Sequence, residues 1–117
     1  MGKNAPIQSL EDRVVRAFVA LGQITELLAV IDRRRDDAGV PGYVRGHDAV
    51  LSRVRALFQG DETFTDSISS IETIPGEVDD SEAIHVIQSD LALLRGAVAA
   101  FLRVRLAASD RTDLGIA

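Results

Sequence analysis

Two long segments of this chain, one towards each end, repeat apolar residues at alternating intervals of three and four. The repeating residues are Val14, Ala17, Leu21, Ile24, Leu28 and Ile31 in the first segment and Ile84, Ile87, Leu91, Leu94, Val98 and Phe101 in the second. This spacing places each set on one stripe of an α-helix, whereas a strand would need strict alternation. We therefore predict two long amphipathic helices, at about 10–36 and 81–108, that pack against each other through their stripes.

Both predicted helices carry more apolar surface than a minimal seam requires. Phe18, Leu27 and Val30 widen the N-terminal stripe. Beyond residue 97 the C-terminal segment is apolar on more than one face, and such a helix is normally covered on several sides. We expect the chain's own packing to leave apolar surface, chiefly around 97–106.

Leftover apolar surface of this kind usually marks a partner. We expect an interface on the C-terminal helix, formed by Val98, Phe101, Leu102, Arg105 and Leu106. Arg105 occupies the stripe position after Phe101, where an apolar residue is due. Its guanidinium must reach solvent, meet a carboxylate or mark the end of the buried seam; alternatively, its charge fixes the pairing with another subunit.

Two shorter helices are expected between the long ones. Apolar residues from Val50 to Phe58 give 48–59 a helical face, and Gly60 suits its C-terminal end. The preceding stretch, 39–46, is rich in glycine and contains Pro41, which predicts a loop.

The segment 61–75 admits two interpretations. Its apolar residues fit a short helix that is capped by Asp61 or Thr63 and ended by Pro75. Its serines, threonines and isoleucines also suit a strand. We favour the helix, because the chain offers no second strand candidate to pair with it.

These elements define an all-α, four-helix bundle-like fold in a single domain. A chain of 117 residues is the size of one domain and can fold without a disulfide or a structural metal. We expect the helical domain at 9–109, between a flexible N-terminal arm, 1–8, and a flexible C-terminal tail, 110–117.

The composition excludes several classes of chemistry and of partner. The absence of cysteine excludes thiol catalysis, cysteine-ligated zinc and disulfides. Eighteen acidic against 13 basic residues make the chain acidic, with a net charge of −5, which argues against nucleic acid and anionic membranes as partners. The N-terminus lacks the apolar core of a signal peptide, and no run of 18 apolar residues occurs. We expect a soluble, cytoplasmic protein.

Two histidine patterns are the candidates for site chemistry. Glu82 and His85 have the spacing of ligands in carboxylate-bridged di-metal bundles, but they fall on the outer side of their helix, so we expect no metal site. His47 with Asp48, beside Tyr43 and Arg45, could form an acid/base cluster at the mouth of a loop, although a histidine next to an aspartate near a helix start is more often a capping arrangement. No serine-nucleophile, phosphate-loop or dinucleotide motif occurs. We therefore expect no catalytic residue and no cofactor.

One stretch resembles a known family. The sequence PGYVRGHDAVLSRVRALF, at 41–58, looks like the corresponding segment of NTF2-like proteins, which are cone-shaped α+β proteins such as limonene-epoxide hydrolases and ketosteroid isomerases. The resemblance implies long strands after residue 60 and a small-ligand-binding or enzymatic domain, with His47 and Asp48 as the polar groups of interest. The alanine-rich C-terminal pattern does not supply such strands, so this function is the alternative.

The leading hypothesis is a non-enzymatic helical interaction or assembly protein. Its simplest form is a homo-oligomer whose C-terminal helices pack across the interface. A subunit of a larger assembly, such as a phage particle or another multi-protein complex, would use the same surface for a different protein.

Overall fold

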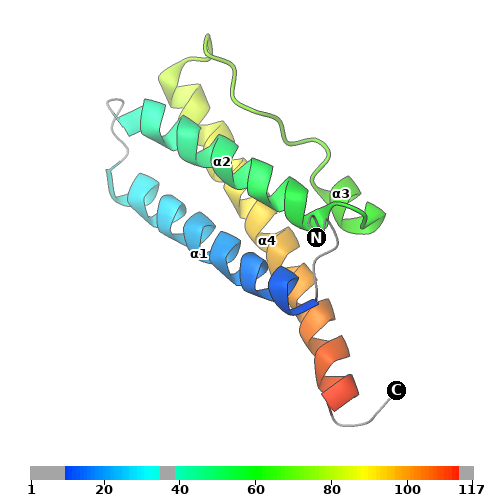
Figure 1. The fold of residues 1–117 in the computed structure, drawn as a ribbon. Helices are drawn as coiled ribbons and strands as arrows, with labels where there is room; N and C mark the ends of the chain where they lie inside the picture. The colour runs from blue at the N-terminus through cyan, green and yellow to red at the C-terminus, as the bar shows by residue number, and fades with distance from the viewer. Residues whose placement is uncertain (1–9, 35–38, 114–117) are drawn as a thin grey trace, which may run out of the picture.

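The computed structural model describes residues 10–34 and 39–113, and within them the chain forms four helices and no strand. The helices are α1 (Leu10–Arg34), α2 (Val40–Phe58), α3 (Glu62–Ser67) and α4 (Asp80–Asp113) (Figure 1). The predicted all-α, bundle-like fold is confirmed.

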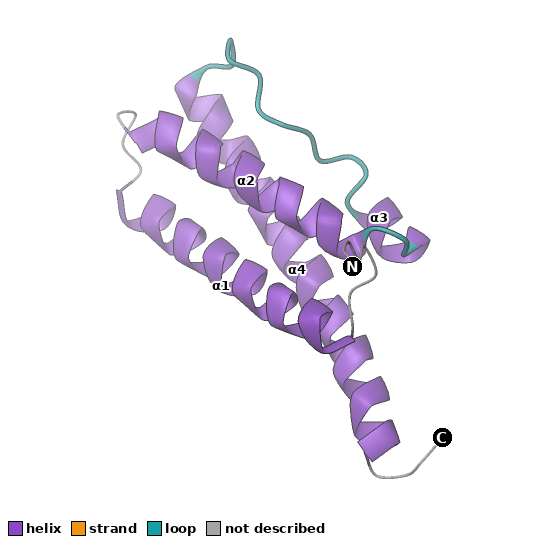
Figure 2. Cartoon of the chain, in the orientation of Figure 1, coloured by secondary structure: helices purple, strands orange, loops and turns teal. Residues whose placement is uncertain are grey.

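Three long helices, α1, α2 and α4, pack against one another (Figure 2). α1 and α2 run in opposite directions, and the loop 68–79 returns along the bundle so that α4 runs in the direction of α2 (Figure 1). The Arg13 guanidinium, near the start of α1, donates to the carbonyl oxygens of Leu57 (3.1 Å) and Gln59 (2.8 Å). It thereby satisfies carbonyl groups that the end of α2 leaves without helical partners.

The core is built from the two predicted stripes and from one face of α2. Every C-terminal stripe residue from Ile87 to Phe101 is fully buried, and Ala17, Ile24 and Ile31 of α1 are buried opposite them. α2 adds a third set of core residues, which consists of Val40, Tyr43, Val50, Leu51, Val54, Leu57 and Phe58. The predicted packing of the two long helices is therefore correct, with α2 as a full third member of the bundle.

The predicted loop at 39–46 is wrong, because α2 already begins at Val40. Pro41 lies in the first turn, where a helix does not need the N–H that proline lacks. Gly46 packs closely against α1, since a Cβ there would lie 2.9 Å from Leu27 Cδ2. The glycine in this segment thus marks a close contact between α1 and α2 and not a loop. The predicted helix 48–59 is the second half of the longer helix α2.

The predicted helix within 61–75 is correct only as far as Ser67. Asp61 accepts a hydrogen bond from the Phe64 N–H (3.5 Å), which caps α3 as expected. Ile68 and Ile71 are buried from an irregular loop rather than from a helix or a strand. Side chains of α2 bind the backbone of this loop, with the Arg55 guanidinium donating to the Ile71 carbonyl at 2.7 Å.

Two predictions about the chain ends concern residues at the limits of the described ranges. The arm 1–8 lies outside the described residues, as do 35–38 and 114–117. α4 continues to Asp113 and therefore includes the first part of the predicted tail 110–117. By length and composition, Asp12–Arg34 and Asp80–Ala107 are apolar enough to cross a membrane, a test that core helices of soluble proteins also pass.

Candidate functional site

A cluster of His47, Asp48 and Asp90 is the most polar group in the core. His47 is fully buried on the inner face of α2. Its Nδ1 lies 2.8 Å from Asp48 Oδ1, and its Nε2 lies 2.7 Å from Asp90 Oδ2 on α4. The Ile74 N–H donates to the same Asp48 oxygen at 3.2 Å. The cluster therefore joins α2, α4 and the loop 68–79.

The hydrogen bonds of this cluster restrict its protonation. A neutral imidazole donates through only one ring nitrogen. His47 therefore donates to both Asp48 and Asp90 only when both of its ring nitrogens carry a hydrogen; otherwise one of the two carboxyl groups must donate to the ring. With no exposed surface on the His47 ring, the imidazole has no direct route to a substrate. The arrangement is that of a structural link between elements.

Neither sequence interpretation of His47 and Asp48 describes this cluster. His47 lies in the interior of α2, so it neither stands at the mouth of a loop nor caps a helix start. The missing residue was Asp90, which lies 43 residues further along the chain. The one sequence signal for it is a carboxylate close to the apolar stripe of α4, between Ile87 and Leu91.

The residues predicted to form an interface belong mainly to the core of the chain itself. Val98 and Phe101 are fully buried, and Leu102 is almost so. The Phe101 ring packs against those of Phe58 and Phe64, with centroid distances of 5.5 Å to each. α2 and α3 therefore cover the seam of α4 as far as Leu102.

Arg105 meets a carboxylate, which was one of the outcomes considered for it. Its guanidinium donates to Asp61 Oδ2 at 2.7 Å and lies 5.0 Å from the centroid of the Phe101 ring. Asp61 thus caps α3 with one oxygen and holds α4 with the other. Leu106, the last residue of the predicted interface, is 39% exposed.

Glu82 and His85 both lie on the exposed side of α4, as their spacing relative to the stripe predicted. Among the described residues, no group of three or more histidine, aspartate or glutamate side chains is arranged to hold a metal ion.

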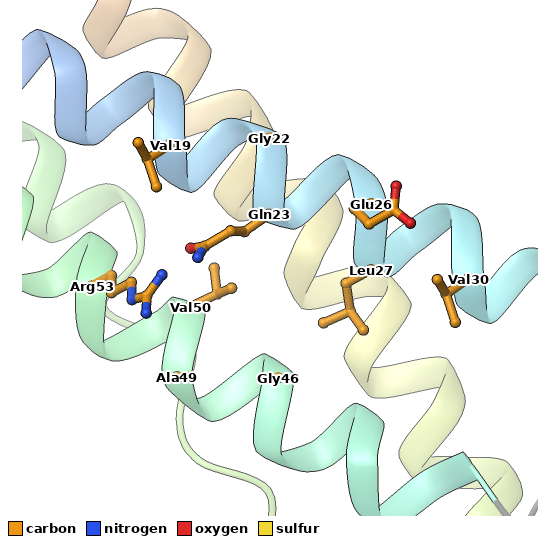
Figure 3. A pocket seen from close by; sticks show the side chains of 10 residues that line it. All are labelled: Val19, Gly22, Gln23, Glu26, Leu27, Val30, Gly46, Ala49, Val50 and Arg53. Carbon is orange, nitrogen blue, oxygen red and sulfur yellow. The ribbon is translucent and has the colours of Figure 1, made fainter.

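A groove of about 550 Å³ lies between α1 and α2 (Figure 3). Its lining residues are Val19, Gly22, Gln23, Glu26, Leu27 and Val30 from α1 and Gly46, Ala49, Val50 and Arg53 from α2. The lining is predominantly apolar, and the small residues Gly22, Gly46 and Ala49 make room for it. The charged side chains Glu26 and Arg53 are both exposed.

An apolar ridge continues this groove along the outer face of α1. This ridge consists of Val15, which is 61% exposed, and Val19, which is 52% exposed. A second hollow of about 350 Å³ extends past Val15 and Val19 towards Ala56 and Leu57 of α2. The wide apolar stripe of the N-terminal segment indicated this surface. The uncovered apolar surface, however, was predicted chiefly on α4.

Gln23 is the unusual polar group of the groove. Its side chain extends from α1 towards Val50 and Arg53 (Figure 3). The Oε1 atom is buried and has no hydrogen-bond partner among the described residues. A buried acceptor in that state lowers stability by roughly 1–3 kcal/mol relative to a satisfied one.

Comparisons with known proteins add no relative, since no family model, curated protein or solved structure matches the chain. The structural class of the protein is therefore defined by its fold and surfaces alone. It is an all-α bundle of three long helices, with a polar link in its core and an open apolar groove on one side.

Proposed function

We propose that this chain is a non-enzymatic interaction or assembly protein that docks a helical partner in the α1–α2 groove and on the adjoining ridge of α1. The observation that carries the proposal is the continuity of the groove with Val15 and Val19, which are more than half exposed. Contiguous apolar surface of this kind on a soluble protein is typical of an interaction site.

The shape of the surface favours a helix as the docking element. A groove between two antiparallel helices accepts the ridge of a third helix, in the way that helices pack within bundles. Small residues at Gly22, Gly46 and Ala49 allow close approach of such a helix. Amphipathic helices commonly bind in hydrophobic grooves through side chains one turn apart.

The C-terminal helix plays a smaller part in this proposal than the sequence suggested. Val98, Phe101 and Leu102 are already covered by the chain itself. Val104 and Leu106 stay exposed on α4 and are available as secondary contacts. The NTF2-like alternative is not proposed, because its α+β fold needs strands and the described residues contain none.

We place the protein in an aqueous compartment such as the cytoplasm. The two helices that are apolar enough to cross a membrane build the bundle core with their stripes. They also carry exposed charged side chains, including Glu26 on α1 and Arg95 on α4, which are costly within a bilayer.

Site-specific photo-cross-linking tests this function for a partner of any identity. A photoreactive amino acid is placed at Val19 in one variant and at Leu93 in a control, since both side chains are 52% exposed but only Val19 lines the groove. In cells that naturally contain the protein, we expect one defined adduct from position 19, identified by mass spectrometry, and none from position 93. Adducts that are absent at position 19, or equal at both positions, would contradict the proposal.

A further inference from the structure

We propose that the occupant of the α1–α2 groove is the same face of a second copy of this chain, packed antiparallel about a two-fold axis close to Gly22. This inference rests on the proposed function and specifies its partner. In such an isologous dimer the same surface serves both copies, and α1 and α2 of each copy together form a four-helix core.

The shape of the face is self-complementary in this orientation. The apolar ridge, Val15 and Val19, lies towards one end of the face, and the hollow beside Gly46 and Leu27 lies towards the other. At about 1.5 Å per residue, Val15 and Val30 lie roughly 10 and 12 Å from Gly22 in opposite directions along α1. A two-fold axis near Gly22 therefore places the ridge of one copy over the hollow of the other.

The charges at the rim of the groove are complementary in the same orientation. Glu26 lies towards the Gly46 end of the groove, and Arg53 lies beside Val19 towards the other end (Figure 3). Antiparallel packing places Glu26 of each copy at the level of Arg53 of the other, whereas parallel packing would set like charges opposite each other. Unlike charges across an interface favour one register and penalise the alternatives.

Charge reversal tests the register of this dimer. Sedimentation equilibrium of the full chain should show a monomer–dimer equilibrium, and Glu26→Arg or Arg53→Glu should each raise the dimer dissociation constant about tenfold. The double variant should return it to within about threefold of the unmodified chain, because it exchanges the charges without removing them. A chain that stays monomeric at about 100 μM, or a double variant as weak as the single ones, would overturn the inference.

Cysteine cross-linking tests the position of the axis independently. The chain has no cysteine, so single-cysteine variants give unambiguous products. A Cβ at Gly22, or at Gly96 on α4, meets nothing within 4 Å, which makes Gly96→Cys a matched control for Gly22→Cys. Under a mild oxidant we expect Gly22→Cys to form disulfide-linked dimers at least tenfold faster, since cysteines near a two-fold axis approach within bonding distance. Equal rates would overturn the inference.

The photo-cross-linking experiment separates this inference from the proposed function. An adduct at position 19 that contains another copy of the chain supports both. An adduct with a different protein, together with a monomeric purified chain, overturns the dimer and leaves the proposed docking function in place. No adduct at position 19 overturns the function, and with it the dimer.

Discussion

The imidazole of His47 on α2 meets the carboxylate of Asp90 on α4, with 2.7 Å between Nε2 and Oδ2. The two residues are 43 positions apart in the chain, and the second ring nitrogen is bound to Asp48. Apolar side chains tolerate small shifts of one helix along another, but the hydrogen bond between His47 and Asp90 is satisfied in only a narrow range of helix positions. The cluster therefore fixes how α2 lies against α4.

Replacing His47 should destabilise the fold strongly. His47→Leu removes the ring nitrogens that hydrogen-bond Asp48 and Asp90, and a partly buried carboxylate left without such a partner costs about 1–3 kcal/mol of unfolding free energy. Urea denaturation followed by circular dichroism measures the loss. His85 on the exposed side of α4 provides the control, and His85→Leu should leave the midpoint nearly unchanged. Equal effects of the two substitutions would refute the structural role of the cluster.

Asp90 should stabilise the fold mainly as a hydrogen-bond partner of His47 and less through its charge. In Asp90→Asn the amide can donate to His47 Nε2 while His47 Nδ1–H donates to Asp48, so both contacts persist. In Asp90→Leu the contact with Nε2 is lost and a buried nitrogen is left without a partner. We expect the asparagine variant to lose less than half the stability that the leucine variant loses, as measured by urea denaturation. A larger loss for asparagine would show that the charge of Asp90 dominates.

The fold class was predictable because the information is local. Alternating intervals of three and four residues define the inner faces of α1 and α4 in any helical arrangement. The length of α2 was not predictable in the same way, because Pro41, Gly42 and Gly46 have the composition of a loop. Gly46 stands within a helix because the Leu27 side chain of α1 occupies the space beside it. The local sequence around Gly46 contains no sign of that contact.

The sites were less predictable than the fold, because they depend on which residues tertiary packing brings together. Asp90 has an ordinary position in the sequence until His47 is placed opposite it. Likewise, the surplus apolar surface predicted on α4 depended on how much of it the intervening helices cover. Phe58 of α2 and Phe64 of α3 cover Phe101, whereas Val104 and Leu106 of α4 stay exposed, as do Val15 and Val19 of α1.

The pair formed by Asp61 and Arg105 should contribute to stability through two separate contacts. Asp61→Ala removes the N-cap of α3 and the partner of Arg105, with an expected loss of about 1–2 kcal/mol. Asp61→Ser keeps a capping oxygen and removes only the charge, so it should cost less. A double-mutant cycle with Arg105→Met isolates the coupling between the two side chains. A coupling energy of zero would mean that the ion pair adds nothing to stability.

Gly46 should resist a substitution that other helical glycines accept. Gly96→Ala meets no neighbour within 4 Å, and it should stabilise the fold by about 1 kcal/mol because alanine favours the helix. Gly46→Ala places a Cβ 2.9 Å from Leu27 Cδ2, so the end of the Leu27 side chain must shift and the gain should be smaller. Shortening the neighbour with Leu27→Val should recover part of the difference. Equal thermal stabilisation by both alanine variants would show that α1 and α2 are not in close contact at this point.

Phe101 should behave as a core residue, although its position in the sequence suggested an interface. Its ring is fully buried against Phe58 and Phe64, so Phe101→Ala should lower the unfolding free energy by about 3–4 kcal/mol at any protein concentration. Leu106→Ala, a few residues further along α4 at a partly exposed position, should cost far less. Denaturation at two protein concentrations that differ about a hundredfold distinguishes the alternatives. If the loss at Phe101 appeared only at the higher concentration, the ring would stabilise an association between chains and not the fold of one chain.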